Sequence, residues 1–119
     1  MIRSARDRLY DIDQNISLVL DVAKRRSLTN FQHDMAFRYT ILHALMIIAE
    51  AASNFPADMT AQHPEVPWPK IIAIGHMIRD DHQRVDARIA WEVATVHLEP
   101  LNEAVRKLLA DLNQPSLPL

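Results

Sequence analysis

A single glycine, Gly75, among 119 residues is the feature that most restricts the fold of this chain. Tight hairpin turns depend on glycine, so an all-β or doubly wound α/β fold is disfavoured. A glycine-rich phosphate-binding loop is excluded for the same reason. The composition, 49% hydrophobic and 24% charged, is typical of a globular protein. We therefore expect an all-α domain.

Hydrophobic residues recur at helical spacing along most of the chain. The pattern and its capping residues predict helices from Ser4 to Arg26, from a Thr29–Gln32 capping box to about Asn54, from Lys70 to Asp81, from Asp86 to Leu98, and from Pro100 to Leu112. In the fourth helix, Ile89, Val93 and Val96 are expected to face the core. These helices form an antiparallel bundle of four or five, a single domain over residues 1–113 with a frayed tail at 114–119.

The stretch from Phe37 to Ala52 is apolar on nearly every side, which predicts a central helix or a subunit interface. His43 and Glu50 interrupt it and, seven residues apart, share one face. They either satisfy each other or a backbone group, or they form the wall of a cleft beside the third helix.

Charge and cysteine content exclude several classes of protein. Without cysteine there is no disulfide framework, thiolate metal site or thiol nucleophile. No signal-peptide pattern is present, and we expect a cytoplasmic protein that does not bind membranes. The net charge of −2 is not that of a dedicated nucleic-acid binder. Two local basic clusters remain: residues 24–26, interpreted as a helix C-terminus rather than an RNA contact, and Arg79, Arg84 and Arg88.

Two short motifs carry a family resemblance. One is His-Pro-Glu-Val-Pro-Trp at residues 63–68, and the other comprises Val85-Asp86, Ile89 and Trp91-Glu92. With the sequence around them, from Tyr10 to Leu109, they resemble the HepT-like branch of the HEPN helical-bundle proteins. The resemblance implies a homodimer through the central helices, a ribonuclease needing no metal or other cofactor, and a toxin–antitoxin pairing with a minimal nucleotidyltransferase. RNA and that nucleotidyltransferase are therefore the expected partners.

The catalytic motif of the family, R-x4-H-x-Y, is altered in this chain. Counting from Trp68 without gaps, its arginine falls on Gly75, the asparagine that follows on His76, its histidine on Asp80 and its tyrosine on His82. Phosphodiester cleavage of this kind needs an acid or base titrating near neutrality and a fixed cation, for which histidine and arginine are suited. Glycine supplies no cation, and a carboxylate repels a phosphodiester. The sequence therefore predicts a degenerate nuclease centre.

Three functions follow from these residues, and whether the protein is an enzyme is left open. The first is a non-catalytic binding module for a nucleotidyltransferase partner or RNA. The second is an active metal-independent endoribonuclease using displaced residues, Arg79 and His82. The third is a nucleotide-binding protein in which Arg79, Arg84 and Arg88 meet phosphate.

Two further expectations concern the end of the third helix. His76 and Asp80, four apart, could ligate a metal with His82, but no third ligand shares their helical register and no metal site is predicted. Asp80 and Asp81 lie where the helix dipole disfavours negative charge. We therefore predict that Arg79, Arg84 or an arginine of a partner chain pairs with one of them.

Overall fold

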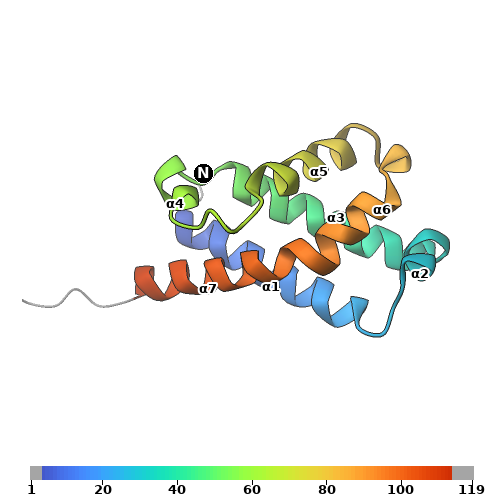
Figure 1. Ribbon diagram of the computed structural model, residues 1–119, viewed down its shortest axis with the longest axis horizontal. Coiled ribbons are helices and arrows are strands. Elements are labelled where there is room, and N and C mark those ends of the chain that lie inside the picture. Colours follow the sequence, from blue (N-terminus) through green and yellow to red (C-terminus); the bar gives the residue numbers. More distant parts are fainter. Residues whose placement is uncertain (1–3, 114–119) are drawn as a thin grey trace, which may run out of the picture.

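The computed structural model describes residues 4–113, which form helices and contain no strand (Figure 1). The elements are α1 (Ala5–Ala23), α2 (Leu28–His33), α3 (Met35–Ser53), α4 (Ala57–Ala61), α5 (Trp68–Asp81), the 3-10 turn η1 (His82–Arg84), α6 (Ala87–Glu92), the π-helical η2 (Val93–His97) and α7 (Leu98–Asn113). In Figure 1 the long helices run alternately in opposite directions. The predicted all-α antiparallel bundle is confirmed, and the predicted tail at 114–119 lies outside the described residues.

Helix α1 forms where the periodicity predicts it. Ser4 caps its N-terminus in a capping box, in which the Asp7 N–H donates to Ser4 Oγ at 3.1 Å. Its buried side chains recur at helical spacing, namely Leu9, Ile12, Ile16 and Val19. The helix ends at Ala23, and Arg25 then adopts φ 61°, the left-handed conformation in which glycine commonly ends a helix.

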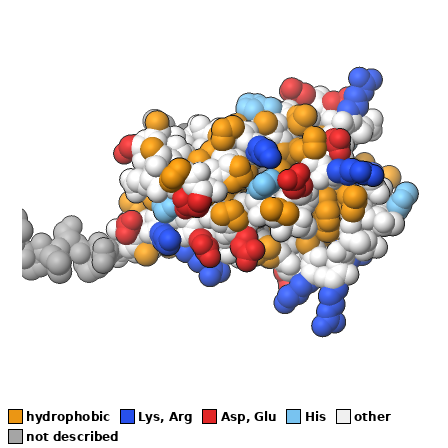
Figure 2. All heavy atoms as spheres, in the orientation of Figure 1, with side chains coloured by type: hydrophobic (Ala, Val, Ile, Leu, Met, Phe, Trp, Pro, Cys, Tyr) orange, Lys and Arg blue, Asp and Glu red, His pale blue; other side chains and the backbone are white. Residues whose placement is uncertain are grey.

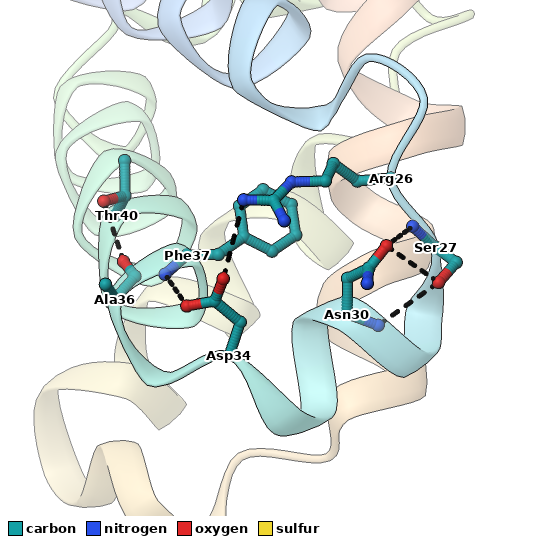
Figure 3. Close-up of polar contacts among 7 residues, drawn as sticks. All are labelled: Arg26, Ser27, Asn30, Asp34, Ala36, Phe37 and Thr40. Carbon is teal, nitrogen blue, oxygen red and sulfur yellow. Dashed lines mark hydrogen bonds and ion pairs between the residues drawn. The ribbon is translucent and has the colours of Figure 1, made fainter.

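The second predicted helix is wrong in two respects. The capping box is formed by Ser27 and Asn30, not by Thr29 and Gln32, so the helix starts earlier. It also breaks at Asp34, whose backbone is extended (φ −99°, ψ 103°) and whose carboxylate accepts from the Phe37 N–H at 3.0 Å (Figure 3). A cap just before the apolar stretch thus starts α3 as a separate helix.

The guanidinium of Arg26 fixes the corner between α2 and α3. It lies 4.4 Å from the ring centroid of Phe37 and 3.6 Å from the Asp34 carboxylate (Figure 3). An arginine predicted at a helix C-terminus therefore joins the next two helices through cation–π and ionic contacts.

Helix α3 lies between α1 and α5, and it contributes the largest set of buried side chains (Figure 1). Within residues 4–113 it is the helix long and apolar enough to cross a membrane, although half of that stretch is buried in the bundle, as in the core helix of a globular domain. His43 and Glu50 are both exposed, so neither is a buried polar group that needs an internal partner.

The proline-rich connector between α3 and α5 is anchored by aromatic contacts. It contains one short helix, α4. Trp68 Nε1 donates to the carbonyl oxygen of His63 at 3.0 Å, and its ring meets Phe55 edge to face at 6.1 Å. Trp68 begins α5 two residues before the predicted start, and Ile71, Ile74 and Ile78 are buried along one face of the helix.

The C-terminal helices form one continuous helical segment rather than two separate helices. Asp86 caps α6 as predicted, and Pro100 lies in the first turn of α7 as predicted. No loop precedes Pro100, because the π-helical turn η2 lies directly before α7. Proline disturbs the preceding helical turn by its missing N–H and its ring, and a π turn absorbs such a disturbance.

The predicted core face of this segment is partly wrong. Val93 is buried, whereas Ile89 and Val96 are 45% and 56% exposed. The ring of Trp91 packs at 5.5 Å from Phe31 and 5.8 Å from Phe37, which turns Ile89 outward. The extra residue of the π turn then moves the buried stripe past Val96 to Leu98.

Candidate functional site

The C-terminal end of α5 is held by its last carboxylate. Asp81 Oδ1 accepts from the Gln83 N–H at 3.2 Å, and Asp81 Oδ2 lies 3.2 Å from Arg84 Nε. The predicted pairing of an arginine with one of the two aspartates is therefore confirmed. Because the Arg84 side chain is 89% exposed, this pair adds little stability. Its consequence is geometric: it closes the turn η1, which begins with His82.

A cavity of about 370 Å³ lies between α3 and the end of α5, and we call it the α3–α5 pocket. Arg79 and His82 line it from α5 and η1. Tyr39, Leu42, His43 and Met46 line it from α3, and Ile78 completes the wall. Arg79 and His82, the displaced candidates from the sequence, thus share one pocket, and a second imidazole from α3 joins them.

The polar groups of this pocket are available to a ligand. Within residues 4–113, Arg79, His43 and His82 have no hydrogen-bond or ion-pair partner. The ring of His82 meets the ring of Tyr39 edge to face, with centroids 5.9 Å apart, which orients the imidazole beside the pocket. An unpaired guanidinium beside two imidazoles suits an anion such as a phosphodiester, because arginine binds phosphate with two parallel hydrogen bonds.

Gly75, the residue on which the count from Trp68 places the motif arginine, is buried against α3. A Cβ atom added there would collide with the Cβ of Ala49, so α3 and α5 approach each other more closely than a larger residue allows. His76 lies one residue on, beside a small cavity that Glu50 and Arg79 also line. Asp80 is exposed and lines none of these cavities.

The other predicted phosphate-binding arginines lie elsewhere. Arg84 pairs with Asp81, and Arg88 follows the N-cap of α6 without lining the α3–α5 pocket. On the face drawn in Figure 2, acidic and basic side chains are interspersed. Arg79 is therefore the member of the predicted trio that the fold places in the pocket. In the described part of the chain, no three His, Asp or Glu side chains are grouped to hold a metal ion.

Sequence reasoning anticipated part of this pocket. It assigned His43 to a cleft wall as one of two readings, but it gave Tyr39 no role. The available signal was spacing: Tyr39, His43 and Met46 follow one another by four and three residues, on the exposed side of an otherwise buried helix.

Comparison with known proteins identifies relatives over almost the whole chain. Residues 12–108 match the family described as Ribonuclease HepT-like. A probable ribonuclease HepT of Thermococcus cleftensis is 30% identical over 108 residues, covering 91% of this chain and 98% of the relative. A putative RNase of Caldanaerobacter subterraneus subsp. tengcongensis is 26% identical, with coverages of 91% and 96%. A putative RNase of Methanocaldococcus jannaschii is 23% identical, with coverages of 89% and 91%. No solved structure matches significantly.

Proposed function

The chain belongs to the HepT-like ribonuclease family, and we propose that it is a member of a toxin–antitoxin type system that binds RNA without cutting it. One observation carries the proposal. The position of the motif arginine is a glycine packed against Ala49, whereas the unpaired Arg79, one turn later, lines the α3–α5 pocket. The pocket thus keeps a cation for phosphate, and the motif positions lack both the arginine and the histidine used for cleavage.

Binding would depend mainly on Arg79. Its guanidinium would hold two phosphate oxygens, and His43 and His82 would add hydrogen bonds or, when protonated, positive charge. A single anchored phosphate gives modest, salt-dependent affinity, since each contact releases less than one counterion from a single strand.

The test is fluorescence anisotropy with labelled single-stranded RNA at several salt concentrations. Arg79→Ala should weaken binding roughly tenfold. It should also reduce the slope of log affinity against log salt concentration by about the contribution of one phosphate contact. Arg106→Ala on α7, an exposed arginine that does not line the pocket, is the matched control and should change little. Equal effects of the two substitutions would reject the α3–α5 pocket as the RNA site.

A second function is favoured by the meeting of His43 and His82 in one pocket. One imidazole would take the proton from a ribose 2′-hydroxyl, whose oxygen attacks the adjacent phosphorus. The other would protonate the departing 5′-oxygen, leaving a 2′,3′-cyclic phosphate, while Arg79 holds the phosphate oxygens. The proteins to which this chain is similar are named as ribonucleases.

An RNA-cleavage assay in EDTA separates the two functions. An active enzyme would give cyclic-phosphate ends and a bell-shaped dependence of rate on pH, and it would lose activity in His43→Ala, His82→Ala and Arg79→Ala. The non-catalytic proposal expects intact RNA with the unsubstituted chain. Cleavage that persists in all three variants would point to a contaminating nuclease.

We also propose that the exposed side of α3 forms a homodimer interface. The first turn of this helix presents Met35 at 58% exposure, and the proposed interface is centred there. Tyr39, at 44% exposure, stays open at its edge, where it lines the α3–α5 pocket. Light scattering after gel filtration should give a dimer mass, and Met35→Glu should shift the protein to monomer. Val96→Glu, at a similarly exposed apolar residue on η2, is the control that should remain dimeric. A monomer without any substitution would reject the interface.

The proposed protein partner is a minimal nucleotidyltransferase, which rests on the family membership alone. A gene for such an enzyme beside this one, and a stable complex when the two are produced together, are the expected results. Two proteins that elute separately would remove this part of the proposal.

A further inference from the structure

A second cavity, of about 400 Å³, adjoins the α3–α5 pocket, and we call it the α2–η1 pocket. It lies between α2 with the first turns of α3 and η1 with the start of α6. Tyr39, Leu42 and His82 line both cavities. The two spaces therefore share a wall, formed by the edge-to-face contact of Tyr39 and His82. Its volume lies within the range of small-molecule sites.

The walls of the α2–η1 pocket combine aromatic and apolar surface with two amides. Phe31 and Leu42 are buried and form apolar wall. Gln32 lies on α2 and Gln83 on η1, and both line the opening. Within residues 4–113, neither side-chain amide has a hydrogen-bond partner, although the backbone of each is engaged.

Two features of the fold place these amides. The break at Asp34 turns α2 against the start of α3, where Arg38 Nη1 donates to the carbonyl oxygen of Gln32 at 2.7 Å. Figure 3 shows the Asp34 corner that separates the two helices. On the other side, the bond from the Gln83 N–H to Asp81 fixes η1. Both amides are thus held by ordered backbone.

We propose that the α2–η1 pocket binds an adenine base of the RNA strand whose phosphate lies in the α3–α5 pocket. This inference rests on the proposed RNA binding. A glutamine amide offers one donor and one acceptor, which match the N6 amino group and N7 of adenine. The aromatic side chain of Tyr39 gives a base a surface on which to stack. The shared wall lets neighbouring parts of one strand occupy both cavities.

Guanine is the competing base, because an arginine also lines this cavity. Arg38 would favour guanine O6 and N7 if its guanidinium were available. It is already held by the Gln32 carbonyl, with its Cζ 5.8 Å from the Tyr39 ring centroid. One of its five N–H donors is thus used inside the protein, whereas both glutamine amides have their donor and acceptor free, and the amides favour adenine.

The experiment compares labelled uridine octamers that carry one central adenine, guanine or cytosine with the all-uridine octamer. A single adenine should tighten binding by about fivefold or more, which is the lower end of discrimination by one good base contact. Gln32→Ala and Gln83→Ala should remove that preference, so that the adenine-containing octamer binds each variant no more tightly than the all-uridine octamer does. Gln14→Ala, an exposed glutamine on α1, is the matched control and should keep the preference.

Three results would overturn the base pocket: equal affinity for all octamers, a preference for guanine, or an adenine preference that survives both glutamine substitutions. If instead the proposed phosphate site is wrong, Arg79→Ala would leave the affinity for every octamer unchanged. In that case adenosine and uridine, which carry no phosphate, are compared by titration. Adenosine binding that is lost in Gln83→Ala supports the pocket by itself, and the absence of such binding rejects it.

Discussion

Substitution of Gly75 by alanine tests how closely α3 and α5 pack at this position. Glycine lies in the middle of α5, and the added methyl group would collide with the Cβ of Ala49 on α3. Ala49 has a single methyl as its side chain, which cannot rotate away. The two helices must therefore move apart for the larger residue to fit.

Two opposing terms set the size of the effect. Alanine favours the helix over glycine by about 1 kcal/mol. Overpacking a close-packed core costs about 1–3 kcal/mol, and this contact is short enough to fall in the upper part of that range. Separating the helices also loosens Ile48 and Ile74, which are fully or almost fully buried on α3 and α5. We expect Gly75→Ala to lower the free energy of unfolding by roughly 1–2 kcal/mol.

Urea unfolding followed by circular dichroism measures this change. Ala73→Gly, at an exposed position of the same helix, is the control and should cost about 1 kcal/mol from propensity alone. The double variant Ala49→Gly/Gly75→Ala moves the methyl group to the other helix and should return close to the original stability. If Gly75→Ala unfolded at a higher urea concentration than the unsubstituted chain, the collision would not exist and the reasoning would be refuted.

The remaining predictions concern helix ends and pH. Arg25→Gly should stabilise the protein by about 0.5–1 kcal/mol, because glycine adopts the left-handed backbone of this residue without strain, and a lower urea midpoint would contradict this. Asp34→Ala should cost about 1–2 kcal/mol, since it removes the cap of α3 and the ion pair with Arg26; a change within error would show that α3 needs no cap. The pKa of Glu65 is lowered from 4.5 by a backbone hydrogen bond at Glu65 itself and then by the hydrogen bond with His63. Because this pKa is lowered in the folded state, the charged Glu65 stabilises the fold at pH values above its ordinary pKa, and that stabilisation is lost as the pH falls through the lowered pKa. Glu65→Gln should therefore make the urea midpoint fall less steeply below about pH 4.5. Parallel pH profiles for the two proteins would count against that linkage.

Local signals in the sequence were enough for several elements. The spacing of Ile71, Ile74 and Ile78 placed the buried face of α5, because a straight helix repeats every 3.6 residues whatever packs against it. Asp86 was recognisable as a cap because its carboxylate accepts from backbone N–H groups only two and three residues later, those of Arg88 and Ile89. The ion pair at Asp81 followed from the helix dipole in the same way.

The errors arose where the same local signal allowed two answers. Ser27 and Thr29 can each begin a capping box. The structure uses Ser27, and in the helix that starts there Phe31 packs against Trp91. Asp34 lies inside the segment that was predicted as one helix, although its carboxylate caps a new one. Val96 was assigned to the core because the 3.6-residue repeat of a regular α-helix was assumed throughout. The π turn inserts one residue and displaces the buried stripe.

The sequence by itself determined the all-α class and most of the helix-forming segments, because composition and periodicity are properties of neighbouring residues. Only the tertiary structure decided that Gly75 packs directly against Ala49 of α3 and that His43, Arg79 and His82 line one pocket. The physical reason is that a side chain's surroundings depend on how distant helices cross, and the crossing of α3 and α5 is set by the whole bundle's packing rather than by either helix alone.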